Sequence, residues 1–313
     1  MRLHSPDFSG RPAIKITDPS DYIAFSRERC GGRLGMLFGE WKAVEPRPSP
    51  PMQLVRGRTL ASEFAGADFW GTHRNTDWSI YLELDAGFDA LLAPANLYDW
   101  EDDPVVQDLQ TRSANPGPMR LIELEWDSRF FPPQMAPAPG DEVLAIGRWD
   151  FDCGHEGHPK GRAENGYRTE IHPFALALTS HVAEESESMV RTIFKLFSAS
   201  RGGPVNATPL MPLQKFWSSQ TSPLGGENYV FELGPAESGW RVTSCELQTA
   251  SHTSGRRRIF DAVVATSNEG TVIQLTIPAA SYHPSDRIES GIIIAGTWVK
   301  GGTLAPTEGV TCK

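Results

Sequence analysis

The chain has no long apolar run and is short of basic residues. No segment reaches the roughly 18 apolar residues that a membrane-spanning helix requires, and the N-terminal MRLHSPDFSG lacks the apolar core of a signal peptide. The 29 Lys and Arg residues are outnumbered by 39 Asp and Glu, for a net charge of −10, whereas nucleic-acid binding needs a basic surplus. We therefore expect a cytoplasmic protein with neither a nucleic-acid nor a membrane partner.

Cysteine is also scarce. Cys30, Cys153, Cys245 and Cys312 lie far apart and form no C-x-x-C pair, a spacing that predicts free thiols in a reducing compartment. The sequence has no G-x-S-x-G motif and no glycine-rich phosphate-binding loop. These absences disfavour a serine α/β-hydrolase and a nucleotide-dependent enzyme.

Glycine and proline, in contrast, are abundant, with 29 and 25 residues, which favours many turns and few long helices. Apolar and polar residues alternate with period two in WSIYLELD and RLIELEWD, as in half-buried strands. Short helices are expected at 20–29, capped at Ser20 or Asp21, and at 103–113. Further strands are expected over 140–152, 167–172, 190–199, 228–234, 240–251, 257–267, 271–279 and 291–301.

This pattern predicts a mostly β protein of two packed antiparallel β-sandwich or barrel-like units with few short helices. The acidic, serine-rich stretch AEESESM places the division near residue 183. We expect an irregular N-terminal segment at 1–51, a β domain at 52–182 and a second β-sandwich unit at 183–313. One continuous sandwich is the alternative.

Polar residues concentrate in the segment 149–174, WDFDCGHEGHPKGRAENGYRTEIHPF, which contains three of the eight histidines. Residues i and i+2 of a strand share a face, so Glu170 and His172 point the same way. If the strands at 140–152 and 167–172 pair, His155 and His158 in the connection can fold back over them. We predict a divalent-metal site, with zinc as the first candidate, held by His155, Glu170 and His172, with His158 or Asp152 as alternates.

The remaining polar residues suggest catalytic roles. A metal-bound water would act as the nucleophile, with Glu156 or Asp152 as general base and Arg168 stabilising negative charge. His73 and Asp77, in GTHRNTDW, would add a ligand or orient an imidazole. A capped turn at Asp77 and a solvated His73 is the competing interpretation, and a purely structural polar network competes with the whole site.

Several runs resemble a motif of uncharacterised bacterial β-rich proteins, in which a strand ending in Asp-Cys-Gly-His is followed by Thr-Glu-Ile-His-Pro. The matching runs here are WDFDCGH, RTEIHP and the companion HRNTDWSIYL, within residues 70–180. The resemblance implies that Asp152, His155, Glu170 and His172 belong to one site, and it implies no particular reaction. Phe174 departs from the second proline that often follows the motif.

Together these patterns predict a metal-dependent enzyme that performs hydrolysis or acid–base chemistry on a small organic substrate. A non-hydrolytic isomerase or cyclase using the same polar cluster in an aromatic-lined pocket is one alternative, and a non-catalytic binding or structural β-sandwich is another. Four aromatic residues are expected to line an apolar pocket beside the site: Trp78, Trp126, Trp149 and Tyr167.

Overall fold

Strands make up most of the described residues. The computed structural model describes residues 1–4, 18–31, 41–44, 52–64, 77–98, 108–109, 111–113, 119–127, 131–156, 166–199, 229–235, 237–251, 263–266, 270–277, 289–301 and 312. The elements are β1 (Arg2–His4), α1 (Pro19–Cys30), β2 (Trp41–Ala43), β3 (Met52–Phe64), β4 (Asp77–Leu84), η1 (Asp89–Leu91), η2 (Pro94–Asn96), β5 (Leu97–Tyr98), β6 (Met119–Asp127), η4 (Pro133–Met135), β7 (Glu142–Glu156), β8 (Tyr167–Glu185), β9 (Met189–Ala199), β10 (Tyr229–Leu233), β11 (Trp240–Ser251), β12 (Val263–Thr266), β13 (Ile273–Ile277) and β14 (Glu289–Lys300).

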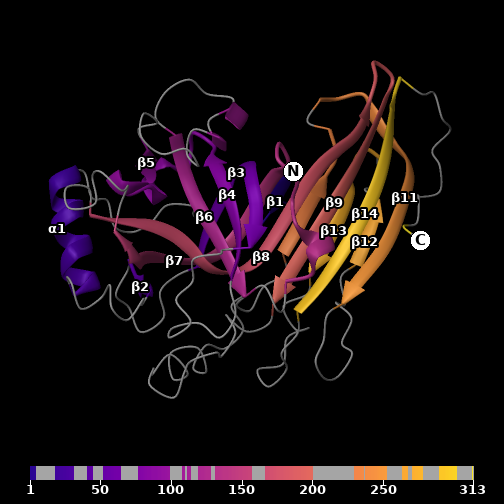
Figure 1. Cartoon of the computed structure of the whole chain (residues 1–313). Helices are drawn as coiled ribbons and strands as arrows, with labels where there is room; N and C mark the ends of the chain where they lie inside the picture. The colour runs from indigo at the N-terminus through magenta and orange to yellow at the C-terminus, as the bar shows by residue number, and fades with distance from the viewer. Residues whose placement is uncertain are drawn as a thin grey trace.

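The strands form two sheets (Figure 1). The large sheet has the order β11-β14-β9-β8-β6-β4-β3-β7-β2, with β5 paired to β6, and the small sheet has the order β1-β10-β13-β12. The predicted mostly β fold is confirmed, and β12 and β13, which lie within the strands expected at 257–267 and 271–279, pair antiparallel. The long strand β3 was not predicted, because Gly57 and a register shift between Thr59 and Ala61 interrupt its alternation.

Five strands of the large sheet close into a ring. The pairs β3–β4, β4–β6, β6–β8 and β8–β7 follow one another, and β7 pairs back with β3. Only β6 and β8 run parallel, over Glu123↔Glu170 and Leu124↔Ile171. The first part of β8 pairs with β6, its second part, from Leu176, pairs with β9, and β7 pairs with both parts from Tyr167 to Ser180. Figure 1 shows β9, β14 and β11 on the opposite side of the molecule from α1.

Two apolar cores flank the large sheet. One contains side chains of the ring strands, such as Ile80, Leu124 and Ile171. The other contains side chains of both sheets, among them Phe194 and Ile294 of the large sheet and Phe231 and Leu275 of the small sheet.

The expected division near residue 183 coincides with the end of β8. Residues 186–188 form the turn into β9, in which the backbone N–H of Ser186 donates to the carbonyl of Met189. The large sheet continues across this turn. The expected irregular segment 1–51 contains β1, α1 and β2 among its described residues.

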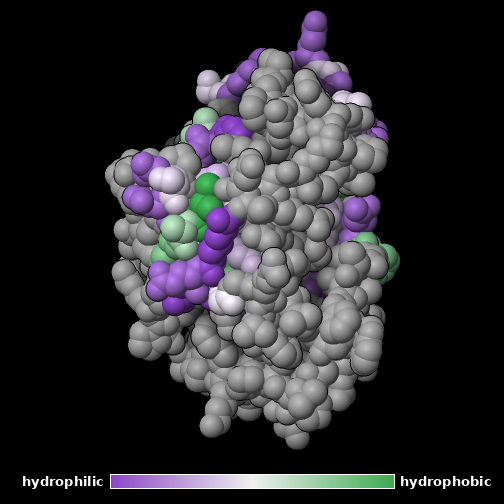
Figure 2. Space-filling model, turned by 60° about the vertical axis from the view of Figure 1, so that its left-hand side comes forward, coloured by the Kyte–Doolittle hydropathy of each residue, from purple (hydrophilic) through white to green (hydrophobic). Residues whose placement is uncertain are grey.

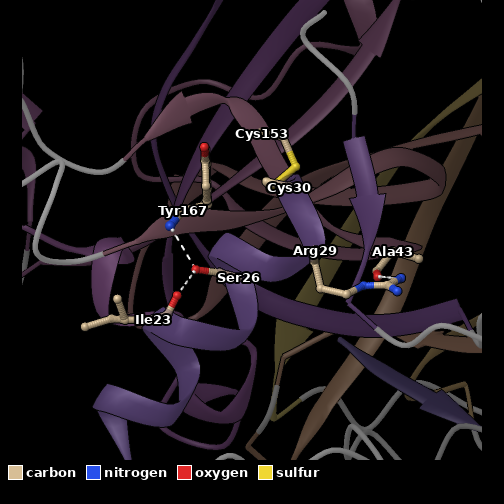
Figure 3. The surroundings of a disulfide bond; sticks show 7 residues. All are labelled: Ile23, Ser26, Arg29, Cys30, Ala43, Cys153 and Tyr167. Atoms are coloured by element: carbon tan, nitrogen blue, oxygen red, sulfur yellow. Dashed lines mark hydrogen bonds between the residues drawn. A yellow bond between two sulfur atoms is a disulfide. The ribbon is translucent and has the colours of Figure 1, made fainter. Parts of the chain in front are cut away.

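Helix α1 is fastened to three strands (Figure 3). It begins after Asp18, whose side chain accepts a hydrogen bond from the backbone N–H of Ser20, so the N-cap lies two or three residues before the predicted positions. Ser26 Oγ accepts from the backbone N–H of Tyr167 in β8 at 3.2 Å, and Arg29 Nη2 donates to the carbonyl of Ala43 at 3.0 Å. Close packing explains Gly166, where φ is +72° and a Cβ would lie 2.5 Å from Ser26 Oγ.

All four cysteines form disulfides, so the prediction of free thiols is wrong. Cys30 at the end of α1 pairs with Cys153 of β7, and Cys245 of β11 pairs with Cys312. Partners 123 and 67 residues apart leave no local signature in the sequence. Structural disulfides are typical of oxidising compartments, which removes the basis for the cytoplasmic expectation. Within the described residues, no helix combines the length and apolar character that crossing a membrane requires.

The described surface offers no large apolar patch in the view of Figure 2, where hydrophobic residues form a small group among hydrophilic ones. Among the described residues, the large hydrophobic side chains that are exposed are Phe64, at 56%, and Val182, at 51%. Phe64 packs edge-on against Trp78, with ring centroids 4.4 Å apart. Isolated exposure of this kind is normal for globular proteins.

Candidate metal centre

One face of the ring strands β4, β6, β7 and β8 carries charged side chains that are almost completely buried. We call this group the carboxylate cluster. Its members are Asp77, Glu123, Glu125, Arg148, Asp150, Asp152, Arg168, Glu170 and His172. All are at most 6% exposed except Arg168, whose side chain is 18% exposed. Residues of alternate parity on the same strands, such as Ile80, Leu124 and Ile171, belong to the apolar core.

Strand register brings these side chains together. Glu170 of β8 lies beside Glu123 of β6 on one side and beside Asp150 of β7 on the other. Glu125 is opposite Ser79 of β4, whose Oγ donates to Glu125 Oε1 at 3.2 Å. Because residues two apart share a face, the next positions along each strand extend the same polar surface.

His172 sits among three carboxyl groups from three strands. Its Nδ1 lies 3.2 Å from Glu125 Oε2 and 3.4 Å from Glu170 Oε1, while its Nε2 lies 3.7 Å from Asp77 Oδ2. Asp77 and Glu170 are fully buried. One imidazolium carries a single positive charge, so it cannot balance three ionised carboxylates.

Two arginines pair with the other carboxylates. Arg168 bridges two strands, with Nη2 2.9 Å from Glu123 Oε2 and Nε 2.7 Å from Asp152 Oδ2. Arg148 Nε lies 2.8 Å from Asp150 Oδ1. These pairs join both arginines to Glu123, Asp150 and Asp152.

Burial shifts the proton affinities of the cluster. Burial, reinforced by the charge of Glu123, raises the pKa of Glu125 to about 8, and burial with the charges of Glu125 and Asp152 raises the pKa of Glu170 well above its usual value. Burial alone lowers the pKa of His172, but its contacts with Glu125, Glu170 and Asp77 outweigh burial and raise the pKa well above 6.5. Burial thus disfavours the ionised form of Glu125 and Glu170 unless a positive charge compensates them.

Two sets of three residues have the geometry of a metal site. In the first, Asp77, Glu125 and His172 each offer a ligand atom within 4.8 Å of the others; in the second, Glu123, Glu125 and Glu170 do so. An imidazole with two carboxylates is a donor set for zinc, iron or manganese, whereas carboxylates alone suit harder cations such as manganese and magnesium.

Several residues singled out in the sequence meet in this cluster. Asp77, Glu170 and His172 converge on one another, and Asp152 and Arg168 form an ion pair next to them. Their roles as ligands, base or charge stabiliser stay predictions.

The other candidates fall outside what the structure describes. His73 and His158 lie outside the described residues, and His155 and Glu156 are described only as backbone of β7.

Four members of the cluster were not expected from the sequence: Glu123, Glu125, Arg148 and Asp150. Glu123 and Glu125 were interpreted as the solvent-facing side of a half-buried strand, whereas they are 4% and 6% exposed. The available signal was that β6, β7 and β8 each carry charged residues at alternate positions, which becomes meaningful only when the strands are neighbours.

The four aromatic residues predicted to line a pocket are buried. Trp78, Trp126, Trp149 and Tyr167 all belong to the apolar core. Trp126 packs between Phe174 and Phe197, and Trp149 Nε1 donates to the carbonyl of Leu91. Trp78, Trp126 and Trp149 directly adjoin acidic members of the cluster in sequence, so the alternation of a strand turns them to the opposite face.

No protein-family model, curated protein or solved structure matches the chain. We therefore infer the function from the geometry and charge of the carboxylate cluster.

Proposed function

We propose that the chain is a metal-dependent enzyme that performs hydrolysis or related acid–base chemistry on a small organic substrate. A divalent cation, with zinc as the first candidate, would be held by Asp77, Glu125 and His172. The observation that carries this proposal is the convergence of one imidazole and two carboxylates, from three neighbouring strands, in a buried and strongly negative environment.

The physical reason is the cost of burying unbalanced charge. An ionised carboxylate removed from water needs a counter-charge, and unpaired buried charge costs several kcal/mol per group, of order 3–5 kcal/mol when a partner is lost. The carboxyl groups of Asp77, Glu125 and Glu170 all lie within 3.7 Å of the single imidazole of His172 and are buried. A divalent cation would supply the compensating positive charge, which would explain why the fold brings these carboxyl groups together.

A bound divalent cation lowers the pKa of a coordinated water and so provides a nucleophile near neutral pH. The chain's own residues would position this centre. Arg168 fixes the carboxylates of Glu123 and Asp152, and Ser79 orients Glu125. Asp152 is the proposed proton acceptor among the described residues.

The two disulfides support a location outside the reducing cytosol. We extend the proposal accordingly: the enzyme works in an oxidising compartment.

The first test is the metal content of the purified protein, measured by elemental analysis before and after chelation and re-addition of Zn²⁺. His172→Ala and Asp77→Asn should lose the metal. His181→Ala is the matched control, because His181 also lies on β8 and its Nδ1 is 2.6 Å from the carboxylate of Asp141. The control should keep the metal content of the wild type.

The catalytic part is tested with chromogenic carboxylate and phosphate esters. Hydrolysis should disappear on chelation, return with Zn²⁺ or Mn²⁺ and be absent in His172→Ala. A wild-type protein that neither contains nor binds a divalent metal would falsify the proposal.

One competing function has an observation in its favour. The arginine pairs and the almost complete burial also fit a structural polar network in a non-catalytic binding protein. That alternative predicts no metal and unchanged melting after chelation. The isomerase or cyclase alternative depended on aromatic residues that pack into the core, so no observation favours it.

A further inference from the structure

The two metal-ligating sets share one residue, Glu125. From this we infer that the centre binds two divalent cations, bridged by Glu125, with the second cation held by Glu123, Glu125 and Glu170. This inference rests on the proposed function and deepens it, because it adds a second cation of different preference to the same site.

The geometry suits a pair of ions. Each set places its potential ligand atoms within 4.8 Å of one another, and both sets include the carboxylate in the middle strand of the three, β6. Cations about 3.5–4 Å apart are typical of two-metal hydrolytic sites, where they stabilise both the attacking and the leaving oxygen. A carboxylate has two oxygens, so Glu125 can contact both ions.

The charge of the cluster also matches two divalent cations when all of its carboxyl groups are ionised. With its six carboxyl groups ionised, two arginines charged and His172 neutral, as metal ligation requires, the cluster carries a net charge of −4. One divalent cation leaves −2 in a buried environment, whereas two divalent cations balance the charge. Balance matters here because uncompensated charge is costly at low dielectric.

Glu170 provides an independent indication of a ligand. It is fully buried, and neither of its carboxylate oxygens receives a well-formed hydrogen bond from the described residues. Its Oε1 lies 3.4 Å from His172 Nδ1. Buried carboxylate oxygens are normally satisfied by donors or by a metal, so Glu170 points to a ligand between it and its neighbours.

The two positions differ in donor chemistry. The first includes an imidazole, which suits zinc, whereas the second offers only carboxylate oxygens and favours harder cations such as Mn²⁺ or Mg²⁺. Mn²⁺ can occupy both kinds of position, and it is paramagnetic, so it serves as the probe.

In the experiment, a chelator removes metal from the native protein without unfolding it, and the protein is then titrated with Mn²⁺. Calorimetry and electron paramagnetic resonance measure the binding. The wild type should bind two equivalents, and the second should produce the exchange-coupled spectrum of neighbouring ions. Glu170→Gln should bind one equivalent without coupling. Glu83→Gln is the matched control: Glu83 is a buried glutamate of β4 that accepts a hydrogen bond from Ser113 and belongs to neither set, so this variant should keep two.

The outcomes separate this inference from the proposed function. One equivalent in the wild type overturns the second cation and leaves the proposed enzyme intact. No binding at all overturns both. Two equivalents without spin coupling, or two that persist in Glu170→Gln, place the second ion elsewhere and also overturn the inference. The wild-type spectrum decides even if a variant fails to fold.

Discussion

Strand β8 carries one histidine in each of its halves, and their surroundings differ. His172 lies in the ring, is 5% exposed and faces carboxyl groups of β4, β6 and β8. His181 lies where β8 pairs with β9, its side chain is 45% exposed, and it contacts the carboxylate of Asp141. A single half-exposed pair of this kind contributes little to stability, so the same residue type has a very different energetic weight at the two positions.

The difference extends to the sheet around each histidine. On β9, the buried Phe194 and Leu196 alternate with the partly exposed Ile193 and Lys195, so one face remains in contact with solvent. On β4 and β6, both faces are buried, and one of them is charged. Burying a polar face without a compensating ligand costs stability, which makes such a face a stronger functional signal than a histidine motif.

The largest expected effect comes from the disulfides, one on each side of this comparison. Cys30–Cys153 fastens α1 beside Asp152, whereas Cys245–Cys312 belongs to the half around β11. Loops of 123 and 67 residues correspond to about 4–5 kcal/mol of unfolding free energy for each bond in a chain-entropy model. Replacing either pair with alanine should therefore lower the denaturation midpoint strongly, as measured by urea unfolding.

The two double variants should differ in metal content. Loss of Cys30–Cys153 should weaken metal binding, because β7 and β8 are both anchored to α1 next to the cluster. Loss of Cys245–Cys312 should leave the metal content of the folded protein unchanged. Equal loss of metal in both variants would show that the cluster responds to global stability only.

A smaller effect is expected from two arginines with unlike surroundings. Arg168→Met leaves Glu123 and Asp152 buried without their guanidinium, which should cost about 3–5 kcal/mol. Arg191→Met is the control, because Arg191 lies 3.7 Å from Glu246 in an exposed pair; it should cost at most about 1 kcal/mol. Calorimetric melting of both variants measures the contrast, and similar losses would contradict a special burial cost in the ring.

The sequence was sufficient to locate most of the strands but not to predict which of their faces are buried. Alternation located β4, β6 and most strands of the second half, because period two is a local property. The same alternation predicts that Glu123 and Glu125 face solvent, because the polar side of a strand is ordinarily the solvent side. That prediction is wrong, since both residues are buried. Closure of the ring places these residues beside Glu170, which comes 45 or more positions later in the chain.

Local patterns also explain which site residues were found. Glu170 and His172 are two positions apart, so their convergence follows from strand geometry alone. Asp150 lies on the neighbouring strand β7. Only the register between β7 and β8 shows that it faces Glu170. The disulfides were not predicted for the same reason, because no local rule connects Cys30 with Cys153.

The smallest expected effect is a pH dependence that distinguishes the His172 side of β8 from the His181 side. In the metal-free folded protein, burial first and then Glu123 raise the pKa of Glu125 from 4.5 to about 8, and the pKa of His172 is also raised. Both groups bind protons more tightly when folded, so their contribution to stability is present at low pH and is lost as pH rises through about 8. Each tenfold difference in proton affinity corresponds to about 1.4 kcal/mol. Urea unfolding of the chelated wild type should therefore show stability falling between pH 5 and pH 8, more steeply than in Glu125→Gln. Parallel curves for wild type and Glu125→Gln would mean that the pKa of Glu125 is not raised by folding, which contradicts the burial cost expected around His172.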